Sequence, residues 1–379
     1  MKVTHIITGL STGGAEMMLY KLLANLNRDT IDCEVISLTD IGPIGVKMQK
    51  IGIPVRPLKM HRGRPSLRAL FCLVRMLQLL PPTVVQTWMY HSDLLGGVAA
   101  KMAGDIPVVW GIRHSDLSKE ANKTTTIWTA KLCSVLSSKL PTNIICNSKA
   151  AVKVHAEFGY NLEKMVVIPN GFDVANFKPD KSARKAVINE LNIADDAILI
   201  GMVARFDPLK DHKNFIDAAA ILKTTIANAH FILCGDGITD NNSQLTQWIA
   251  QAKLDGNCHL LGRRDDIAKI TASLDIATSA SIGEGFSNTI GEAMACSVPV
   301  VATDVGDSAY IVGDGGEIVP AKNCQSLAQA WEKLITAGQA KREEFGKHAR
   351  RRIMSEFDIK TVAKQYETLY QSIANKCVE

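Results

Sequence analysis

The chain has 379 residues, of which 46% are hydrophobic and 21% are charged, and its formal net charge at pH 7 is +5. A chain of this length exceeds the usual size of a single hydrophobic core, so we expect two domains. The best candidate for a membrane span, ALFCLVRMLQLL, is shorter than the ~20 apolar residues required and contains Arg75, so we expect no membrane-spanning helix.

The charges are distributed unevenly along the chain. Residues 1–175 carry 20 Lys and Arg against 12 Asp and Glu, whereas residues 176–379 carry 23 against 26. A basic first half predicts an acidic partner on that side: a membrane surface, phosphates or nucleic acid. The nine cysteines show no C-x-x-C pairing, and most lie in apolar segments, as buried free thiols do in a reducing cytoplasm.

Strand-like and helical segments alternate through the first half. KVTHIIT at residues 2–8 predicts a strand and not a signal peptide, because it breaks into a glycine-containing turn. The helix expected next has leucines at 19, 22, 23 and 26. Further strands are expected at 32–38, 83–88, 107–113, 142–148 and 164–171. This alternation predicts a parallel sheet wound with helices.

A polar segment at 170–187, which contains Pro179, predicts a domain boundary near residue 175. The alternating pattern then restarts. Strands are expected at 198–207, 230–237, 257–263, 274–281 and 299–305, and the tail from about Ser326 is helical. Ligands of such sheets bind beyond the carboxyl ends of the strands, so we expect the site between two doubly wound halves.

The first strand-to-helix turn, GLSTGGAE, contains Gly13 and Gly14. Glycines let the backbone approach a ligand closely and present N–H groups at a helix start. The turn has neither the G-x-G-x-x-G fingerprint nor a Walker A motif, which argues against a dehydrogenase or a P-loop enzyme. A tight turn without a ligand is the alternative.

The segment GMVARFDPLKDHKN begins the second half, and its Arg205 and Lys210 flank a proline-containing turn. Two cations at the end of a strand predict a diphosphate site, since each charge-assisted hydrogen bond contributes roughly 1.5–3 kcal/mol. The alternative is a pair of solvated loop cations.

The segment EGFSNTIGE runs from Glu284 to Glu292 around the expected start of a helix. Thr289-x-x-Glu292 fits a capping box. Alternatively, the backbone N–H groups of Ser287, Asn288 and Thr289 bind a phosphate, Glu292 holds a ribose, and Glu284 holds a sugar on the far side of the diphosphate. A nucleotide-sugar accounts for both acids, whereas NAD or ATP accounts for only one.

Seven segments resemble the retaining glycosyltransferases of family 4, which have the GT-B architecture. They are STGGAE (11–16), NSKA (147–150), VIPNGFD (167–173), GMVARFDPLKD (201–211), CGDG (234–237), LGRRDDI (261–267) and EGFSNTIGEAMACSVPVVATD (284–304). They follow the family's order across nearly the whole chain. The resemblance implies an α/β fold of two Rossmann-like, doubly wound domains facing across a cleft.

The same resemblance implies how the domains divide the work. Residues 1–175 form the acceptor-binding domain and residues 176–357 the nucleotide-sugar-binding domain. A helix at about 358–379 packs back on the first domain.

The resemblance also implies catalytic roles. Glu284 corresponds to the glutamate that contacts the donor sugar beside the reacting carbon. Arg205 and Lys210 correspond to the cations that stabilise the leaving diphosphate. His114 lies where the family has a histidine facing the sugar, although a polar residue that ends a strand is the alternative.

Substrate-binding roles follow in the same way. Glu292 corresponds to the residue that holds the ribose, Gly13 and Gly14 to the N-terminal diphosphate loop, and Arg263 to the segment that holds the base. The remaining donor contacts are expected from Phe286, Ser287, Asn288 and Thr289.

The implied activity is retaining, metal-independent transfer of a hexose or N-acetylhexosamine from a UDP-sugar. The implied acceptor is a glycan or a lipid-diphosphate-linked glycan of bacterial surface polysaccharide synthesis, and Trp88 to His91 are expected near it. No Asp-x-Asp motif stands out and the nine histidines make no metal-ligand cluster, so we expect neither a metal nor another cofactor.

Residues 59–80 begin basic and continue as an amphipathic helix. Leu67, Leu70, Phe71, Val74 and Leu77 are expected to line one side. Such a segment predicts peripheral contact with an anionic membrane, at the inner face of the plasma membrane for a cytoplasmic protein. A core helix with solvated ends is the alternative.

Two other functions compete with the transferase. A non-hydrolysing UDP-sugar epimerase has a similar architecture and needs no acceptor. A nucleic-acid-binding protein with a basic surface is the other, but no basic patch is interleaved with aromatic residues, so we expect no nucleic-acid partner.

Overall fold

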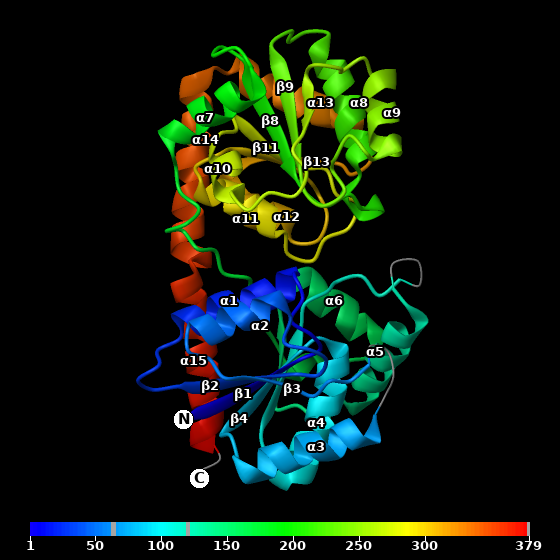
Figure 1. Ribbon diagram of the computed structural model, residues 1–379, viewed down its shortest axis with the longest axis vertical. Coiled ribbons are helices and arrows are strands. Elements are labelled where there is room, and N and C mark those ends of the chain that lie inside the picture. The colour runs from blue at the N-terminus through cyan, green and yellow to red at the C-terminus, as the bar shows by residue number, and fades with distance from the viewer. Residues whose placement is uncertain (62–65, 119–121, 377–379) are drawn as a thin grey trace. The chain divides into compact units, whose positions relative to one another are not determined.

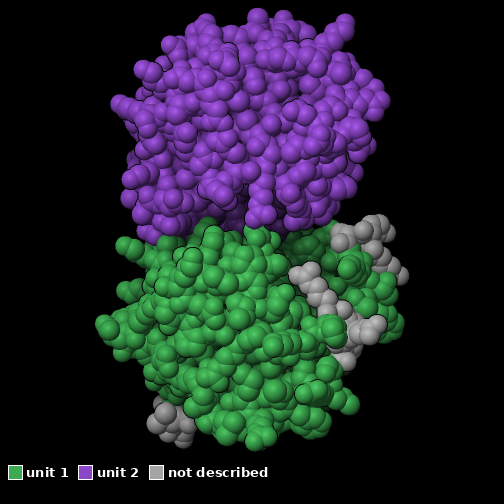
Figure 2. Space-filling model, in the orientation of Figure 1, with its two compact units in different colours: residues 1–171, 359–379 green, residues 172–358 purple. Residues whose placement is uncertain are grey.

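The computed structural model describes residues 1–61, 66–118 and 122–376. The chain forms two compact units, one comprising Met1–Gly171 with Ile359–Glu379 and the other Phe172–Asp358 (Figure 2). The sequence predicts these boundaries after residues 175 and 357. The second unit is therefore inserted into the first, whose last element comes from the end of the chain.

In the described part of the first unit, seven parallel strands form one sheet in the order β3-β2-β1-β4-β5-β6-β7. Figure 1 labels β1 to β4 of this sheet. The strands are β1 (Lys2–Ile7), β2 (Asp32–Ser37), β3 (Val55–Pro57), β4 (Val84–Trp88), β5 (Val108–Ile112), β6 (Asn143–Cys146) and β7 (Met165–Val167). Every residue of β4 and β5 is buried, as the near-continuous apolar segments VVQTW and VVWGI require in a sheet covered on both faces.

Helices cover both faces of this sheet. They are α1 (Gly14–Asn25), α2 (Gly42–Lys50), α3 (Leu67–Leu79), α4 (Tyr90–Gly104), α5 (Thr124–Leu136), α6 (Lys149–Phe158), the short η1 (Leu162–Lys164) and α15 (Ile359–Lys376). Side chains of α1, α2 and α15 share one core, and side chains of α3, α4, α5 and α6 share the other. The fully buried Tyr366 and Tyr370 anchor α15 in the first of these cores.

The second unit contains a parallel sheet of six described strands in the order β10-β9-β8-β11-β12-β13. The strands are β8 (Ile198–Val203), β9 (Ala229–Cys234), β10 (Cys258–Leu260), β11 (Ile276–Ser279), β12 (Val300–Thr303) and β13 (Gly316–Val319). The helical elements are α7 (Lys181–Leu191), η2 (Pro208–Lys210), α8 (His212–Lys223), α9 (Ser243–Gln251), α10 (Ile267–Ala272), α11 (Asn288–Ala295), α12 (Ser308–Val312), η3 (Gly313–Gly315), α13 (Cys324–Thr336), α14 (Gln339–Arg352) and η4 (Ile353–Phe357). Phe215 of α8 and Trp331 of α13 meet edge to face on one side of this sheet.

The amphipathic helix α3 buries only part of the predicted apolar side. Its buried residues are Ala69, Leu73, Val74 and Leu77. Leu67 and Phe71 are 75% and 60% exposed, so the part of the predicted apolar side that they form is not buried. Arg62 and Arg64, from the basic start of this segment, lie outside the described residues. Helix α3 therefore has one buried side and one exposed, partly apolar side. It is neither a fully buried core helix nor an amphipathic helix free at the surface.

Helix α5 presents a second exposed apolar line on the same side of the sheet. Trp128, Leu132 and Val135 lie at helical spacing and are 72%, 47% and 67% exposed. Over the described ranges, no helix combines the length and hydropathy that crossing a bilayer requires.

Candidate active site

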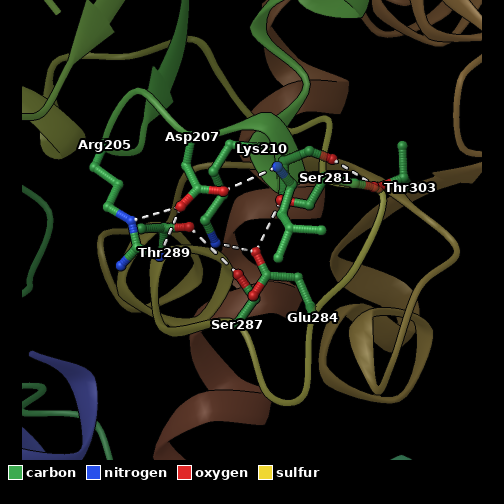
Figure 3. Close-up of polar contacts among 10 residues, drawn as sticks. Arg205, Asp207, Lys210, Ser281, Glu284, Ser287, Thr289 and Thr303 are labelled. Atoms are coloured by element: carbon green, nitrogen blue, oxygen red, sulfur yellow. Dashed lines mark hydrogen bonds and ion pairs between the residues drawn. The ribbon is translucent and has the colours of Figure 1, made fainter. Parts of the chain in front are cut away.

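In the turn after β8, the carboxylate of Asp207 binds the side chain of Arg205. Oδ1 of Asp207 accepts the backbone N–H of Leu209 at 2.9 Å and so caps η2. Its Oδ2 accepts hydrogen bonds from Nε and Nη2 of Arg205 at 3.0 and 2.8 Å (Figure 3). Burial alone would raise the pKa of Asp207, but the Leu209 hydrogen bond and the Arg205 guanidinium hold that pKa below its usual value. Asp207 therefore stays ionised and orients Arg205.

Lys210 and Glu284 form an ion pair between Nζ and Oε1 (Figure 3). Their side chains are 24% and 12% exposed, so the pair is shielded from bulk water. Oγ of Ser281 donates to the same Oε1 at 2.8 Å, and the Thr303 hydroxyl donates to the Ser281 carbonyl at 2.6 Å. The Glu284 carboxylate is thus held in place from two sides.

The two loops that carry this pair are joined directly. The N–H of Ile282 donates to the carbonyl of Leu209 at 2.8 Å, which ties the loop after β11 to η2. Because β8 and β11 are neighbours in the parallel sheet, their carboxyl ends lie at the same edge. The sequence prediction that Arg205, Lys210 and Glu284 lie close to one another follows from this pairing.

Two glycines permit the close approach of neighbouring loops. Gly306 has φ +57, and a Cβ there would lie 2.2 Å from the Glu284 carbonyl oxygen. Gly235 has φ +154, and its Cβ would lie 2.1 Å from the carbonyl of Ala204, next to Arg205. Any side chain at either position would push the site loops apart.

The helix after Glu284 begins two residues earlier than a Thr289 capping box requires. Ser287 is the N-cap residue of α11, and its side chain makes no capping hydrogen bond, so the capping box was wrong. The side chains of Ser287 and Thr289 lie 3.4 Å apart between their oxygen atoms. Since the N-cap side chain does not bind the first N–H groups of α11, this helix start suits an anionic group.

Glu292 lies one turn along the same helix. With Thr289 it lines a small pocket against Gly201 and Val203 of β8. This places the second glutamate near the strand end that also carries Arg205.

Two of the predicted substrate-binding residues, Phe286 and Arg263, differ in how accessible their side chains are. The Phe286 side chain is buried and stacks on Phe172 with ring centroids 6.1 Å apart, so its ring belongs to the core. In the LGRRDDI segment, Arg264 pairs with Glu190 and Asp266, while Arg263 is exposed. Arg263 thus remains accessible to a ligand, as base stacking would require.

The other predicted residues belong to the first unit. Gly13 is the N-cap residue of α1, and a Cβ there would lie 2.3 Å from Oε2 of Glu16. The Glu16 carboxylate therefore occupies the helix start where Gly13 and Gly14 were expected to receive a phosphate. His114 is partly buried two residues beyond β5.

A pocket of about 720 Å³ opens at the carboxyl ends of β1, β2 and β4. Its apolar lining residues are Leu38, Met60, Met89, Leu94, Leu95 and Trp128. Of the WMYH segment, Met89 and His91 line this pocket, whereas Trp88 and Tyr90 point into the core. Sequence reasoning missed most of this pocket because its residues come from separate turns.

Within the residues that the structure describes, no group of three or more His, Cys, Asp or Glu side chains is arranged to hold a metal ion.

Two protein-family models match successive parts of the chain. The model of Glycosyltransferase Family 4 matches residues 12–176, and the model of Glycosyl transferases group 1 matches residues 183–352. The two matches leave only the ends and a short connection uncovered.

Curated relatives match over most of their length. The UDP-Gal:alpha-D-GlcNAc-diphosphoundecaprenol alpha-1,3-galactosyltransferase of Escherichia coli is 24% identical over 82% of this chain and 81% of its own. The N,N'-diacetylbacillosaminyl-diphospho-undecaprenol alpha-1,3-N-acetylgalactosaminyltransferase of Campylobacter jejuni is 24% identical over 96% of this chain and 98% of its own.

Solved structures share the fold over almost the whole chain. Anabaena Alr3699/HepE in complex with UDP superposes with a TM-score of 0.86 and 25% identity, over 98% of this chain and 100% of that one. The same protein in complex with UDP-glucose gives a TM-score of 0.83, over 98% of this chain and 99% of that one.

Proposed function

The chain belongs to the family 4 and group 1 glycosyltransferases of GT-B fold, and from this premise we propose that it transfers a hexose or N-acetylhexosamine from a UDP-sugar with retention of anomeric configuration. The observation that carries the proposal is the Lys210–Glu284 ion pair, whose Glu284 lies in the loop that leads into the start of α11. It combines a cation and N–H groups for a diphosphate with a carboxylate for sugar hydroxyls.

The cations act on the leaving group in this proposal. Lys210 uses one N–H for Glu284 and keeps two for phosphate oxygens. Arg205 uses Nε and Nη2 for Asp207, so Nη1 remains to donate. Positive charge placed where the diphosphate departs stabilises the transition state more than the bound donor.

The carboxylates hold the two sugars. Glu284 accepts hydrogen bonds from the transferred sugar, held in place by Ser281, and Glu292 accepts them from the ribose. The bond between the anomeric carbon and the phosphate oxygen breaks as the acceptor oxygen attacks the same face. The departing phosphate oxygen takes the acceptor proton, which yields the glycoside and UDP. Because Glu292 lies at the nucleotide end in this proposal, it is not the second acid beside the scissile bond that hydrolysis with paired acids requires.

The proposed donor and acceptor are supported by the relatives. A structural neighbour of 25% identity binds UDP and UDP-glucose, and two relatives are named for diphosphoundecaprenol-linked acceptors. We therefore assign a UDP-sugar donor and a lipid-diphosphate-linked glycan acceptor in surface polysaccharide synthesis. Since Arg205 and Lys210 supply the positive charge for the diphosphate, we propose that transfer needs no metal.

Membrane contact is part of the same proposal. The exposed Leu67 and Phe71 of α3 stand beside the exposed Arg68 and Arg75. Apolar side chains next to cations suit an anionic bilayer, where each cation contributes about 1 kcal/mol. We propose that residues 59–80 contact the inner face of the plasma membrane, where a lipid-linked acceptor resides.

The test is release of UDP from a panel of UDP-sugars in the presence of EDTA, with and without a diphospholipid-linked acceptor. Release from one donor, accelerated by the acceptor, supports the donor class and metal independence together. Retention is read from the anomeric configuration of the product by NMR. Conversion of the donor sugar without UDP release identifies an epimerase instead.

A further inference from the structure

Met89 adopts a backbone conformation that favours glycine. Its φ is 72° and its ψ is 154° at the N-cap of α4. Asp105, Asn192 and Asp211 also have positive φ, but their ψ values of 38°, 44° and 55° are those of the left-handed helical region. The conformation of Met89 is outside that region and is strained for a residue with a side chain.

Backbone hydrogen bonds hold this turn on both sides. The N–H of Met89 donates to the carbonyl of Gly111 at 2.9 Å. The Met89 carbonyl accepts the N–H groups of Ser92 and Asp93 at 3.0 and 2.9 Å. The turn is thereby fixed between β5 and the first turn of α4.

The buried carboxyl group of Asp93 stabilises the backbone on both sides of this turn. Oδ1 of Asp93 accepts the Thr87 hydroxyl at 2.6 Å and the N–H of Gly111 at 3.2 Å. Asp93 and Thr87 are fully buried and do not line the pocket. This network fixes the backbone of the pocket wall without contacting a ligand.

A glycine at position 89 would form the same turn without strain. We therefore expect the methionine side chain to have a function that offsets the strain. That side chain lines the apolar pocket of the first unit. Methionine is long, flexible and apolar, which suits contact with another flexible apolar chain.

The pocket wall continues as an apolar surface. Trp128 lines the pocket and is itself 72% exposed, and Leu132 and Val135 follow it along α5. These three side chains lead from the pocket along one side of the helix. A hydrocarbon chain laid on them has apolar contact from the pocket outward.

We propose that Met89 is a specificity-determining residue, which the strained turn holds against the hydrocarbon chain of a lipid-diphosphate-linked acceptor. The inference deepens the proposed function and rests on it for the identity of the acceptor. In this proposal, the part of the hydrocarbon chain nearest the diphosphate binds in the pocket of the first unit.

The test uses Met89→Gly, Met89→Ala and, as a control for the effect of glycine, Lys253→Gly. Lys253 is exposed in the second unit and has φ 54. The acceptor is N-acetylglucosamine diphosphate carrying a short alkyl chain, and N-acetylglucosamine 1-phosphate serves as the acceptor without a chain. KM for each acceptor, UDP release without acceptor, and the midpoint of thermal unfolding are measured.

Met89→Gly is expected to raise KM for the alkyl acceptor roughly tenfold or more, since it removes the apolar contact between the methionine side chain and the alkyl chain. The same variant should unfold at a higher temperature, because the strain is relieved. Met89→Ala should raise KM equally without the gain in stability. KM for the acceptor without a chain should rise much less than KM for the alkyl acceptor, and Lys253→Gly should leave every KM unchanged.

An unchanged KM for the alkyl acceptor in both Met89 variants overturns the proposal, as does equal loss for the acceptor without a chain. Calorimetric binding of the alkyl acceptor separates this result from failure of the proposed transfer, because binding needs no donor. If the wild type releases no UDP from any donor, weaker binding by Met89→Ala still supports the assignment of the pocket. Equal binding by the two proteins, or none by the wild type, refutes it.

Discussion

Replacement of Lys210 by alanine tests the site most directly. The substitution removes a cation that is 24% exposed and leaves Glu284, at 12% exposure, with the Ser281 hydrogen bond. A hydrogen bond between a cation and a charged oxygen contributes about 1.5–3 kcal/mol, and each 1.36 kcal/mol corresponds to a factor of ten in rate. If that bond forms to the departing diphosphate, turnover at saturating donor and acceptor should fall roughly 10- to 150-fold.

Lys213→Ala is the matched control for this measurement. Lys213 lies three residues further on, at the start of α8, and pairs with Asp217 at 2.6 Å, but the two side chains are 45% and 40% exposed. Exposed pairs at this helical spacing contribute only about 0.3–0.5 kcal/mol, so turnover should remain close to wild type. The assay is continuous UDP release, with thermal unfolding to confirm that both variants are folded. Wild-type turnover in Lys210→Ala, or equal losses in the two variants, would refute the assignment of Lys210 to the leaving group.

Three further predictions concern the ribose, a buried acid and the membrane. Glu292→Ala should weaken binding of free UDP about tenfold or more by calorimetry, since it loses charge-assisted hydrogen bonds to the ribose; unchanged affinity would leave Glu292 with a packing role. Burial raises the pKa of Asp93 from 3.8 to about 8, so the folded carboxyl retains its proton and stability falls as pH rises between these values. Asp93→Asn should therefore lose less stability than the wild type between pH 5 and pH 8 in urea unfolding, and parallel curves would contradict this. Phe71→Ser combined with Trp128→Ser should reduce sedimentation with anionic liposomes severalfold, whereas Met354→Ser, at a residue 49% exposed in the second unit, should not. Equal sedimentation of the double variant and the wild type would exclude membrane contact through these two side chains.

Sequence patterns predicted the strands inside each sheet and the edge strands β7 and β10, but missed β3 and β13 at the opposite edges. Segments such as VVWGI are apolar throughout because both faces of a central strand are covered. β3 has only three residues, including Arg56 and Pro57, and β13 begins at Gly316. Short edge strands with such residues carry no alternating or continuous apolar signal.

The charged pair of the site was predictable for a topological reason. Arg205 and Lys210 follow β8 and Glu284 follows β11, and these strands are adjacent. The partners that hold those side chains were not predictable, because Asp207 reads as an ordinary turn residue and Ser281 acts through a contact that only the folded loops create.

Three local features could not be predicted from residue type alone. Ser287 and Thr289 are both good N-cap residues, and tertiary packing of the loop selects the first. Phe286 lies inside a conspicuous motif, yet its ring fills the core beside Phe172. In α3 the periodicity predicts an apolar stripe, but the neighbouring α4 determines which residues it buries.

The inserted topology has a consequence for synthesis on the ribosome. Residues up to Gly171 emerge first, but their core stays open until α15 supplies Tyr366 and Tyr370. At typical elongation rates, the nascent first unit waits about 10–40 s for this helix, while the second unit is already complete at Asp358. A message truncated there would therefore yield an intact second unit joined to a first unit with an open core, whose Arg113 lacks the Tyr366 hydroxyl that it contacts in the finished protein.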